Sequence, residues 1–495
     1  MADTLLIVHG YSDGSTSFTG LGDFFIASGA YKADNVFYLD YSSMDDEATF
    51  HDFADKLDSD HRDRLGGARI DVACHSTGSL VVRAWLALHE ERARRRRLDE
   101  PCPVHRLFCF APANFGSDLA SMGQSFLGKF RSTFFNSNAH REDFLESGKV
   151  VLQGLEPASP FQWMLSVDYD LHGASYFNFS PQWPEEKRCY PFVFAAGEAY
   201  TGIQAKLIRQ RALPGTDGTV RIAGTSLNTR GCSLDFRRDH ARLVWWPDTR
   251  GARIPFAVFA GFNHGSIIEP KTAGFDAPLG PGTLAHTIAT SSTTLATYAE
   301  LAETFDRTSE DNYARLPADR QDRYQQFFFR VRDDVNLEVD DYFIDFHVAH
   351  RDGTPHEALT VRFDEDFETQ VYRHSAAPTY RVFMMNCSKL HSFHQALRQE
   401  DALLMLEVTG VSKLPDVRYP TRAFIAFDPA ADVGPGEPYL LEPNTTTFVD
   451  VILDRQETDK LLVIRDYRRT VVVSVSAPAP EVTTGRAALV EQAKP

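Results

Sequence analysis

The sequence predicts an α/β fold with a doubly wound, mostly parallel sheet, followed by an all-β, sandwich-like domain. The first observation is a series of short apolar runs separated by helical or long connections, as in a parallel sheet covered by helices on both faces. These runs lie near residues 4–8, 35–39, 69–73, 106–110, 191–197 and 254–260. The second observation is a change of character after about residue 320, where short runs alternate and turn formers separate them. That pattern is typical of a β-sandwich, and its strands are expected near 325–331, 342–348, 379–385, 403–408, 424–427, 446–452 and 471–475.

The third predicted strand leads into the pentapeptide Cys74-His75-Ser76-Thr77-Gly78, and a helix-like run follows at 79–88. A strand, a sharp turn with serine at its apex and a helix together form the geometry of a nucleophile elbow. The turn needs small neighbours because the helix packs close to the strand, and Gly78 and Cys74 are both small. We therefore predict that Ser76 is a catalytic nucleophile.

A serine nucleophile needs a base that takes its proton and an acid that orients the base. In an elbow fold these follow the serine in the order acid, then histidine, on loops after strands. Asp217 lies in a loop after the run at 191–197, and His264 lies directly after the run at 254–260. We predict that they are the acid and the base. The alternatives lie in an arginine-rich, polar stretch with weaker strand context, and they are Asp235, Asp239 and Asp248 for the acid and His240 for the base.

The oxyanion hole is expected to consist of two backbone N–H groups. One belongs to Thr77, the residue after the nucleophile. The other is predicted to belong to Tyr11, just past the first strand, where Gly10 permits a tight backbone. His9 and His75 are expected to be structural.

These segments together resemble the α/β-hydrolase superfamily. More narrowly they are similar to its lipase-like branch, which includes bacterial lipases, lecithin–cholesterol acyltransferase-like enzymes and type VI secretion lipase effectors. The resemblance covers residues 1 to about 270 and departs from the branch's usual pattern at Cys74 and at Ala113-Asn114. It rests on His9-Gly10, the elbow at 74–78, the Ala-Pro-Ala-Asn-Phe-Gly-Ser segment at 111–117, Asp217-Gly218-Thr219-Val220 and Asn263-His264-Gly265-Ser266.

The resemblance implies a serine carboxylic-ester hydrolase, of lipase or phospholipase type, that acts on lipid esters through an acyl-enzyme. A thioesterase or an acyltransferase would use the same three residues. A catalytically silent binding protein on a hydrolase scaffold is the alternative from another class, and the complete Ser-Asp-His set argues against it. No cofactor is expected.

The interval 116–190 contains no clear sheet strand and is rich in aromatic residues, so it is predicted to be a cap or lid inserted into the catalytic domain. A helical subdomain that packs its own aromatic residues is the alternative. The predicted domains are a catalytic domain at 1–305, a linker at 306–320, a β-sandwich accessory domain at 321–478 and a flexible tail at 479–495. The accessory domain is expected to contact a membrane interface or a protein partner.

Composition disfavours some partners, membrane insertion and a metal site. The formal net charge of −17 disfavours a nucleic-acid partner. No apolar run is long enough to span a membrane and no signal peptide is apparent, so synthesis as a cytoplasmic protein is expected, with signal-independent secretion left open. The six cysteines lack Cys-x-x-Cys spacing, which disfavours a metal site, and Cys74 and Cys109 are expected to be small core residues.

Overall fold

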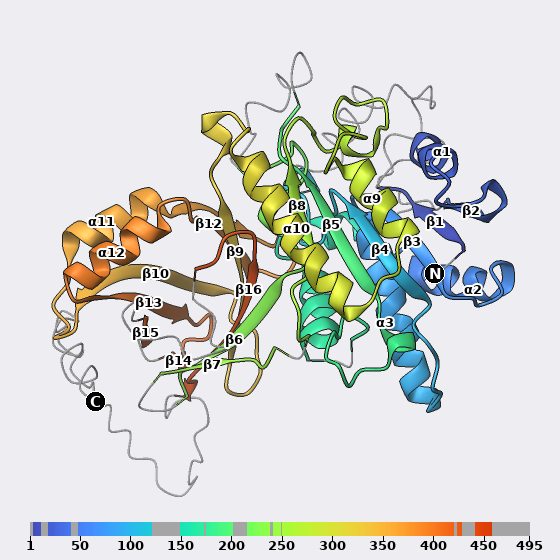
Figure 1. Cartoon of the computed structure of the whole chain (residues 1–495). Helices are drawn as coiled ribbons and strands as arrows, with labels where there is room; N and C mark the ends of the chain where they lie inside the picture. Colours follow the sequence, from blue (N-terminus) through green and yellow to red (C-terminus); the bar gives the residue numbers. More distant parts are fainter. Residues whose placement is uncertain are drawn as a thin grey trace, which may run out of the picture.

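The computed structural model of the chain describes residues 3–10, 18–40, 48–120, 149–172, 175–200, 215–237, 241–248, 250–419, 423–427 and 441–457. Within this part of the chain, one region is built on a parallel sheet and the other on a mixed sheet, and the two lie side by side (Figure 1). The parallel sheet comes from the N-terminal half. The mixed sheet comes mainly from the C-terminal half, drawn in yellow to red.

Six parallel strands form the first sheet in the order β2-β1-β3-β4-β5-β8. Each of the six apolar runs predicted from the sequence is one of these strands, so the predicted sheet is confirmed. The chain moves outward from β1 to β2 and then returns to place β3 on the other side of β1. At such a reversal, ligands bind beyond the carboxyl ends of the strands. The bounds are β1 (Leu5–Val8), β2 (Val36–Leu39), β3 (Ile70–His75), β4 (Val104–Phe110), β5 (Tyr190–Ala196) and β8 (Phe256–Phe259).

Helices cover both faces of this sheet, because its central strands are apolar on both sides. On one face Phe25 of α1 contacts Phe108 of β4, and Tyr298 of α10 contacts Phe192 of β5. Helices α2 and α3 pack on each other over the opposite face (Figure 1). The helices of this region are α1 (Thr19–Ala27), η2 (Ala33–Asn35), α2 (Phe50–Arg64), α3 (Gly78–Arg96), α8 (Ile222–Thr225), η6 (Ser266–Ile268), α9 (Pro281–Thr290), α10 (Leu295–Tyr313) and η7 (Ala318–Arg320).

Helix α10 extends into the stretch that the sequence predicted as a linker. It begins with a capping box at Thr294 and continues through Tyr313. The linker predicted over 306–320 therefore begins inside a helix rather than after it. The physical reason is that the apolar face of the helix continues past the charged residues, since Phe305 and Tyr313 are both buried.

Two further sheets enclose a second core. A six-stranded sheet has the order β11-β12-β9-β16-β6-β7, a three-stranded sheet has the order β10-β13-β15, and β14 pairs with β17. The strands predicted between 325 and 452 are all present, whereas the one near 471–475 lies outside the described residues. The bounds are β6 (Thr229–Asp235), β7 (Arg242–Trp245), β9 (Tyr324–Asp333), β10 (Asp341–His350), β11 (Glu368–Arg373), β12 (Tyr380–Asn386), β13 (Ala402–Val411), β14 (Val417–Arg418), β15 (Ala423–Phe427), β16 (Thr446–Leu453) and β17 (Gln456–Glu457).

Two helices also belong to this β-rich region, which the sequence predicted as all-β. They are α11 (Glu357–Asp366) and α12 (Leu390–Gln399), and both lie beside β10 and β13 (Figure 1). Each buries one apolar stripe, α11 through Leu359 and Phe363 and α12 through Phe393 and Leu397. The rings of Phe363 and Phe393 meet at 5.5 Å between centroids. The helix pair thus contributes to the same core as the sheets.

Strands β6 and β7 come from the chain between Asp217 and His264, yet they join the second sheet. β6 pairs in parallel with β16, so that Thr229 lies opposite Thr446. The segment predicted as a catalytic domain at 1–305 therefore contributes two strands to the sheet of the region predicted at 321–478. The positions of the domain boundaries stay a prediction, and the tail at 479–495 lies outside the described residues.

A third hydrophobic cluster joins the two regions. Trp163 contacts Phe328 of β9 at 5.4 Å and Phe448 of β16 at 5.3 Å between ring centroids. Phe115, which follows β4, contacts the same Phe448 at 5.7 Å. Because Trp163 is only 2% exposed, this contact is a packed interior.

The described part of the interval 116–190 contains four short helices joined by turns and loops. It holds α5 (Lys149–Leu155), α6 (Pro160–Trp163), the π-helix η4 (Met164–Leu171) and η5 (Glu185–Lys187). Trp163, Phe177 and Phe179 all pack into hydrophobic clusters, and Trp163 does so against strands from outside this interval. The lid stays a prediction, and its other aromatic residues at 126, 130, 134, 135 and 144 lie outside the described residues.

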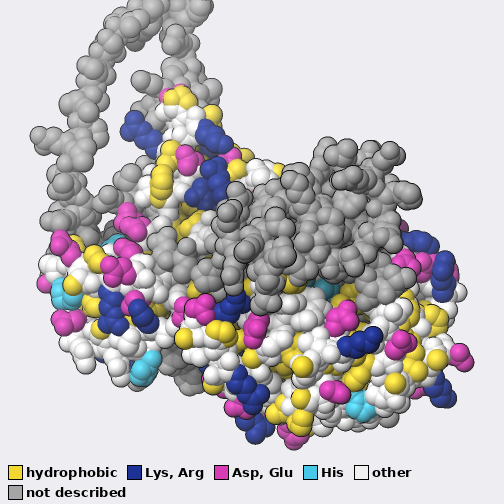
Figure 2. All heavy atoms as spheres, turned by 90° about the horizontal axis from the view of Figure 1, so that it is seen from above, with side chains coloured by type: hydrophobic (Ala, Val, Ile, Leu, Met, Phe, Trp, Pro, Cys, Tyr) yellow, Lys and Arg dark blue, Asp and Glu magenta, His cyan; other side chains and the backbone are white. Residues whose placement is uncertain are grey.

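The surface side chains, the lengths of the apolar helices and the cysteines are features for each of which the composition gave an expectation. In Figure 2, acidic and basic side chains are interspersed on the described part of the visible face, with apolar side chains scattered among them. No helix within the described ranges is long and apolar enough to cross a membrane. All six cysteines are free and buried. Cys74 and Cys109 are small residues of the core, as predicted.

Candidate active site

Ser76 lies at the turn between β3 and α3, beyond the carboxyl end of the strand. Its φ is 52°, in the left-handed region. Gly78 allows this turn, because a Cβ at that position would lie 2.6 Å from the carbonyl oxygen of His9 and 2.7 Å from that of Val8. Gly10 is similarly close, since its Cβ would lie 3.0 Å from the Cβ of Ser76. The sharp turn and the two glycines have the geometry predicted for an elbow.

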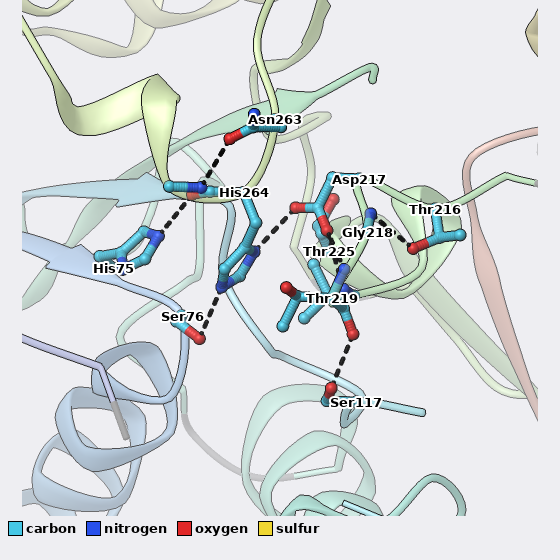
Figure 3. A network of polar contacts seen from close by, with 12 residues as sticks. His75, Ser76, Ser117, Thr216, Asp217, Gly218, Thr219, Thr225, Asn263 and His264 are labelled. Atoms are coloured by element: carbon cyan, nitrogen blue, oxygen red, sulfur yellow. Dashed lines mark hydrogen bonds and ion pairs between the residues drawn. The ribbon is translucent and has the colours of Figure 1, made fainter. Parts of the chain in front are cut away.

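Three side chains from distant parts of the chain meet at this turn (Figure 3). His264 Nε2 lies 3.0 Å from Ser76 Oγ, and His264 Nδ1 lies 2.8 Å from Asp217 Oδ2. The side chain of His264 is 4% exposed and that of Asp217 1%. A carboxylate accepts hydrogen bonds only, so Nδ1 carries the proton and Nε2 is left as the acceptor for the serine hydroxyl.

The Asp217 carboxylate is held by its own loop. Its Oδ1 accepts hydrogen bonds from the backbone N–H groups of Thr219 at 2.9 Å and Val220 at 2.8 Å. Gly218 has a φ of 99°, which permits the tight turn. Oδ1 is therefore occupied, and Oδ2 is directed at His264.

The loop that carries His264 is held by neighbouring polar groups. Asn263 Oδ1 accepts hydrogen bonds from the N–H groups of Gly265 and Ser266. His75 Nε2 donates to the backbone oxygen of His264 at 2.8 Å, and the two imidazole rings lie 4.7 Å apart. Burial lowers the pKa of His75 well below its usual value, and the nearby His264 lowers it further. His75 is thus a neutral hydrogen-bond donor that holds the His264 backbone, in agreement with the structural role expected for it.

The described rival acids lie elsewhere. Asp235 is in β6 and binds Arg237, and Asp248 binds Arg250. Asp239 and His240 lie outside the described residues. Of the predicted oxyanion donors, Thr77 is described at the start of α3. The other, Tyr11, falls outside the described residues.

Comparisons with known proteins give matches among solved structures. No family model matches the sequence, and neither does any curated protein. Phospholipase PlaB from Legionella pneumophila superimposes with a TM-score of 0.74 at 21% identity, and covers 96% of this chain and 98% of that one. The chain has the α/β-hydrolase fold. The same phospholipase in complex with thio-NAD matches equally, with a TM-score of 0.74 at 21% identity over 95% and 98% of the chains. Lipase BlEst2 from Bacillus licheniformis in its mature form has a TM-score of 0.31 at 14% identity over 54% of this chain and 87% of that one.

Within this α/β-hydrolase fold, the segment after β4 supports the acid loop. Ser117 Oγ donates to the Thr219 carbonyl at 2.6 Å, and Asn114 Nδ2 donates to the Thr225 carbonyl at 2.7 Å. Both side chains belong to the Ala-Pro-Ala-Asn-Phe-Gly-Ser segment that carried part of the resemblance. Sequence reasoning assigned them no role, because nothing local indicates that they reach a loop about a hundred residues later.

The described side chains of this chain form no group of three or more histidine, cysteine or acidic residues that could hold a metal ion. The groups that meet at Ser76 are instead a hydroxyl, an imidazole and a carboxylate in series. Such a series can move one proton from the hydroxyl to the imidazole.

Proposed function

We propose that this protein is a serine carboxylic-ester hydrolase that acts on lipid esters. One observation carries the proposal: the hydrogen-bonded series from Ser76 Oγ through His264 to Asp217, with separations of 3.0 and 2.8 Å. The series lies at the elbow of an α/β-hydrolase fold, where a nucleophile is exposed to substrate beyond the strand ends. We infer that these three residues are the catalytic triad.

The reaction follows from the protons of these groups. Ser76 Oγ attacks the ester carbonyl carbon while its proton passes to His264 Nε2. The imidazolium then gives this proton to the departing alcohol oxygen, and an acyl-Ser76 ester remains. Water, deprotonated by the same Nε2, attacks that ester, and the imidazolium returns the proton to Ser76 Oγ as the acid is released. Asp217 Oδ2 holds the Nδ1 proton and stabilises the positive imidazolium in both halves of the reaction.

The oxyanion that forms during each attack needs donors nearby. We propose the backbone N–H groups of Thr77 and Tyr11. Thr77 follows the nucleophile at the start of α3, where backbone N–H groups and the helix dipole favour negative charge. The close approach of Gly10 to Ser76 supports the use of the β1 loop as the second source.

A lipid ester is the favoured substrate class. The support is the phospholipase named among the matching structures, together with the aromatic composition of the interval 116–190. A thioesterase or acyltransferase would form the same acyl-Ser76. The fate of the acyl group in the presence of a thiol or a second alcohol therefore separates these activities.

The first test is turnover of p-nitrophenyl esters of increasing chain length and of phospholipid vesicles. Ser76→Ala, Asp217→Asn and His264→Ala should each lower kcat on the order of 10³-fold or more, and a double variant should be little worse than a single one because the triad acts as a unit. Asp235→Asn is the matched control, since it removes a carboxylate charge outside the site and should leave turnover unchanged.

A fluorophosphonate probe gives an independent readout, because it reacts covalently with an activated serine. The probe should label Ser76 in the unaltered chain, and it should label the His264→Ala variant much more slowly. Labelling at another serine, or turnover that Ser76→Ala leaves intact, would contradict the assignment of the nucleophile.

A further inference from the structure

The acid loop is a closed hairpin whose second arm ends in an arginine. Thr216 and Arg221 form an antiparallel bridge, and the Ile222 N–H donates to the Gly215 carbonyl at 2.9 Å. The Asp217 N–H donates to the Val220 carbonyl at 3.1 Å. Asp217 therefore lies at the tip of a hairpin, and Arg221 lies at its base.

Arg221 is 5% exposed and binds both regions of the molecule. Its Nε donates to Asp118 Oδ2 at 2.7 Å, in the segment after β4. Its Nη2 donates to Tyr372 Oη at 2.6 Å and to Gln370 Oε1, both in β11. The guanidinium carbon also lies 5.4 Å from the centroid of the Tyr372 ring. Hydrogen bonds from a charged donor are among the stronger ones, and a planar fork fixes direction as well as distance.

The face of the second sheet that holds Arg221 also packs against the rest of the hairpin. Gln370 and Tyr372 are two residues apart, so both point to one face of β11. Tyr324 of β9 lies against Gly215, where a Cβ would come within 2.3 Å of the ring. Gly215 has a φ of 70°, so the hairpin base needs glycine for both space and backbone conformation.

We propose that Arg221 is a positioning residue for the catalytic acid, and that Tyr372 and Gln370 of the C-terminal sheet hold it in place. This inference rests on the proposed function, because it assigns Asp217 the role of the acid. The second sheet then contributes to the catalytic centre by holding the residue that positions the acid. The role differs from that of an accessory module that only brings the enzyme to an interface.

The expected consequence is a loss of rate without a loss of binding. If the Tyr372 hydroxyl or the Gln370 amide is removed, Arg221 at the base of the hairpin loses a hydrogen-bond partner. The turn at Ser76 should keep its structure. A shift of the acid of about 1 Å can cost on the order of a hundredfold in rate. We therefore expect Tyr372→Phe to lower kcat on the order of tenfold, and Gln370→Met combined with Tyr372→Phe to lower it on the order of a hundredfold, both with little change in KM on p-nitrophenyl butyrate.

Tyr342→Phe is the matched control. Tyr342 is a buried residue of β10 whose hydroxyl donates to the Thr379 carbonyl at 3.0 Å, away from the acid hairpin. The Tyr342→Phe variant loses a buried hydroxyl in the same region, so its thermal midpoint should be lower while its kcat is unchanged. Equal falls of kcat in Tyr342→Phe and Tyr372→Phe would overturn the positioning role.

A double-mutant cycle with Asp217→Asn separates positioning from a general loss of order. If Tyr372 acts through the acid, Tyr372→Phe should change kcat less than about twofold once Asp217 is an amide. A further fall on the order of tenfold in that background would overturn the proposal, since the hydroxyl would then act by another route.

The cycle also distinguishes this inference from the proposed function. Loss of turnover in Ser76→Ala and Asp217→Asn together with unchanged kcat in the Tyr372 and Gln370 variants would refute the positioning role alone. Normal turnover in Asp217→Asn would refute the assignment of the acid. Thermal midpoints of the full-length variants establish that each is folded.

Discussion

Ser76 has a backbone conformation that residues with a side chain rarely adopt, with a φ of 52°. Such strain typically costs about 1–3 kcal/mol and persists only where surrounding contacts enforce it. Here the Ser76 N–H donates to the Phe110 carbonyl at 3.2 Å, and the Ser76 carbonyl accepts from the Ala113 N–H at 3.0 Å. The segment after β4 thus holds the elbow from one side, and Gly78 allows β1 to approach from the other.

Gly78→Ala should be strongly destabilising, because the added methyl group would meet two backbone oxygens that cannot rotate away. We expect the free energy of unfolding to fall by about 1–3 kcal/mol, with loss of turnover as Ser76 moves. Urea denaturation followed by circular dichroism measures the change.

The control for this substitution is Gly20→Ala in α1, where the added Cβ would lie 3.5 Å from Pro270 in ordinary contact. That change should leave stability equal or slightly higher, since alanine is the better helix former. If Gly78→Ala behaved like Gly20→Ala, the close packing of α3 on β1 would not be the reason for glycine in the elbow.

At the scale of an element, α3 runs from the turn at Ser76 to a half-buried acidic group. Its first turn follows Ser76, and Arg83 in the middle binds Ser166 and Asp170 of η4 at 2.8 Å each. Farther along, Glu90 is half-buried, and burial followed by the charge of Asp170 raises its pKa to about 8. Arg94 of the same helix and Lys187 of η5 lower that pKa without cancelling the shift.

The raised pKa of Glu90 makes stability depend on pH in a defined direction. In the unfolded chain this carboxyl ionises near pH 4.5, and in the folded protein near pH 8. Between these values the folded state binds more protons than the unfolded state, so the free energy of unfolding falls as pH rises. The stability that the protonated Glu90 contributes is lost above pH 8.

Glu90→Gln removes this titration while keeping the shape of the side chain. Its thermal midpoint relative to that of the unaltered chain should therefore rise as the pH increases from about 5 to about 9. Glu300→Gln on the exposed face of α10 is the control and should show no such trend. If the difference in thermal midpoint between Glu90→Gln and the unaltered chain did not change with pH, the Glu90 carboxyl would titrate normally in the folded state.

The strands of the first sheet could be predicted because each contains a short apolar run, and the central strands β3, β4 and β5 are buried on both faces. The three residues that meet at the elbow could be predicted because Ser76, Asp217 and His264 each follow one of those strands. Strand β6 could not, because Thr229–Asp235 is a mixed stretch that becomes a strand only by pairing with β16. Helix α12 carried a readable signal, since Phe393 and Leu397 are four residues apart, but short helices inside a β-rich stretch are easily taken for loops.

At the scale of the whole molecule, the two regions share structure rather than merely touching. The N-terminal half of the chain contributes β6 to the second sheet, where it pairs with β16, and the Trp163 cluster and Arg221 contact both regions. The sequence predicted an accessory domain because the proposed triad lies entirely within residues 1–305. Sequence spacing alone does not reveal that the β-rich region packs against the loop of the acid.

A chain of residues 1–320 tests this integration. It would keep α10 but leave β6 without its parallel partner and would expose Phe115, Trp163 and Ala223 to water. We expect it to have a lower thermal midpoint, to bind hydrophobic dyes and to hydrolyse soluble esters poorly.

The comparison is a chain that lacks only 479–495, the tail predicted from composition, which should behave as the full chain does. If residues 1–320 formed a compact protein with full turnover on soluble esters, the β-rich region would be an accessory module after all. Size-exclusion chromatography and initial rates on p-nitrophenyl butyrate distinguish these outcomes.

The pairing of β6 with β16 also bears on the moment at which the proposed activity can first appear while the chain is being made. Arg230 and Thr447, which touch in the finished sheet, are 217 positions apart in the chain. A ribosome that adds ~5–20 residues per second needs roughly 10–40 s to cover that distance. During this time Ser76, Asp217 and His264 have all been synthesised, but the sheet that braces the acid hairpin has not. A growing chain of this kind would hold the three residues of the proposed triad without their final alignment, so that the proposed ester hydrolysis would begin only after most of the polypeptide has left the ribosome.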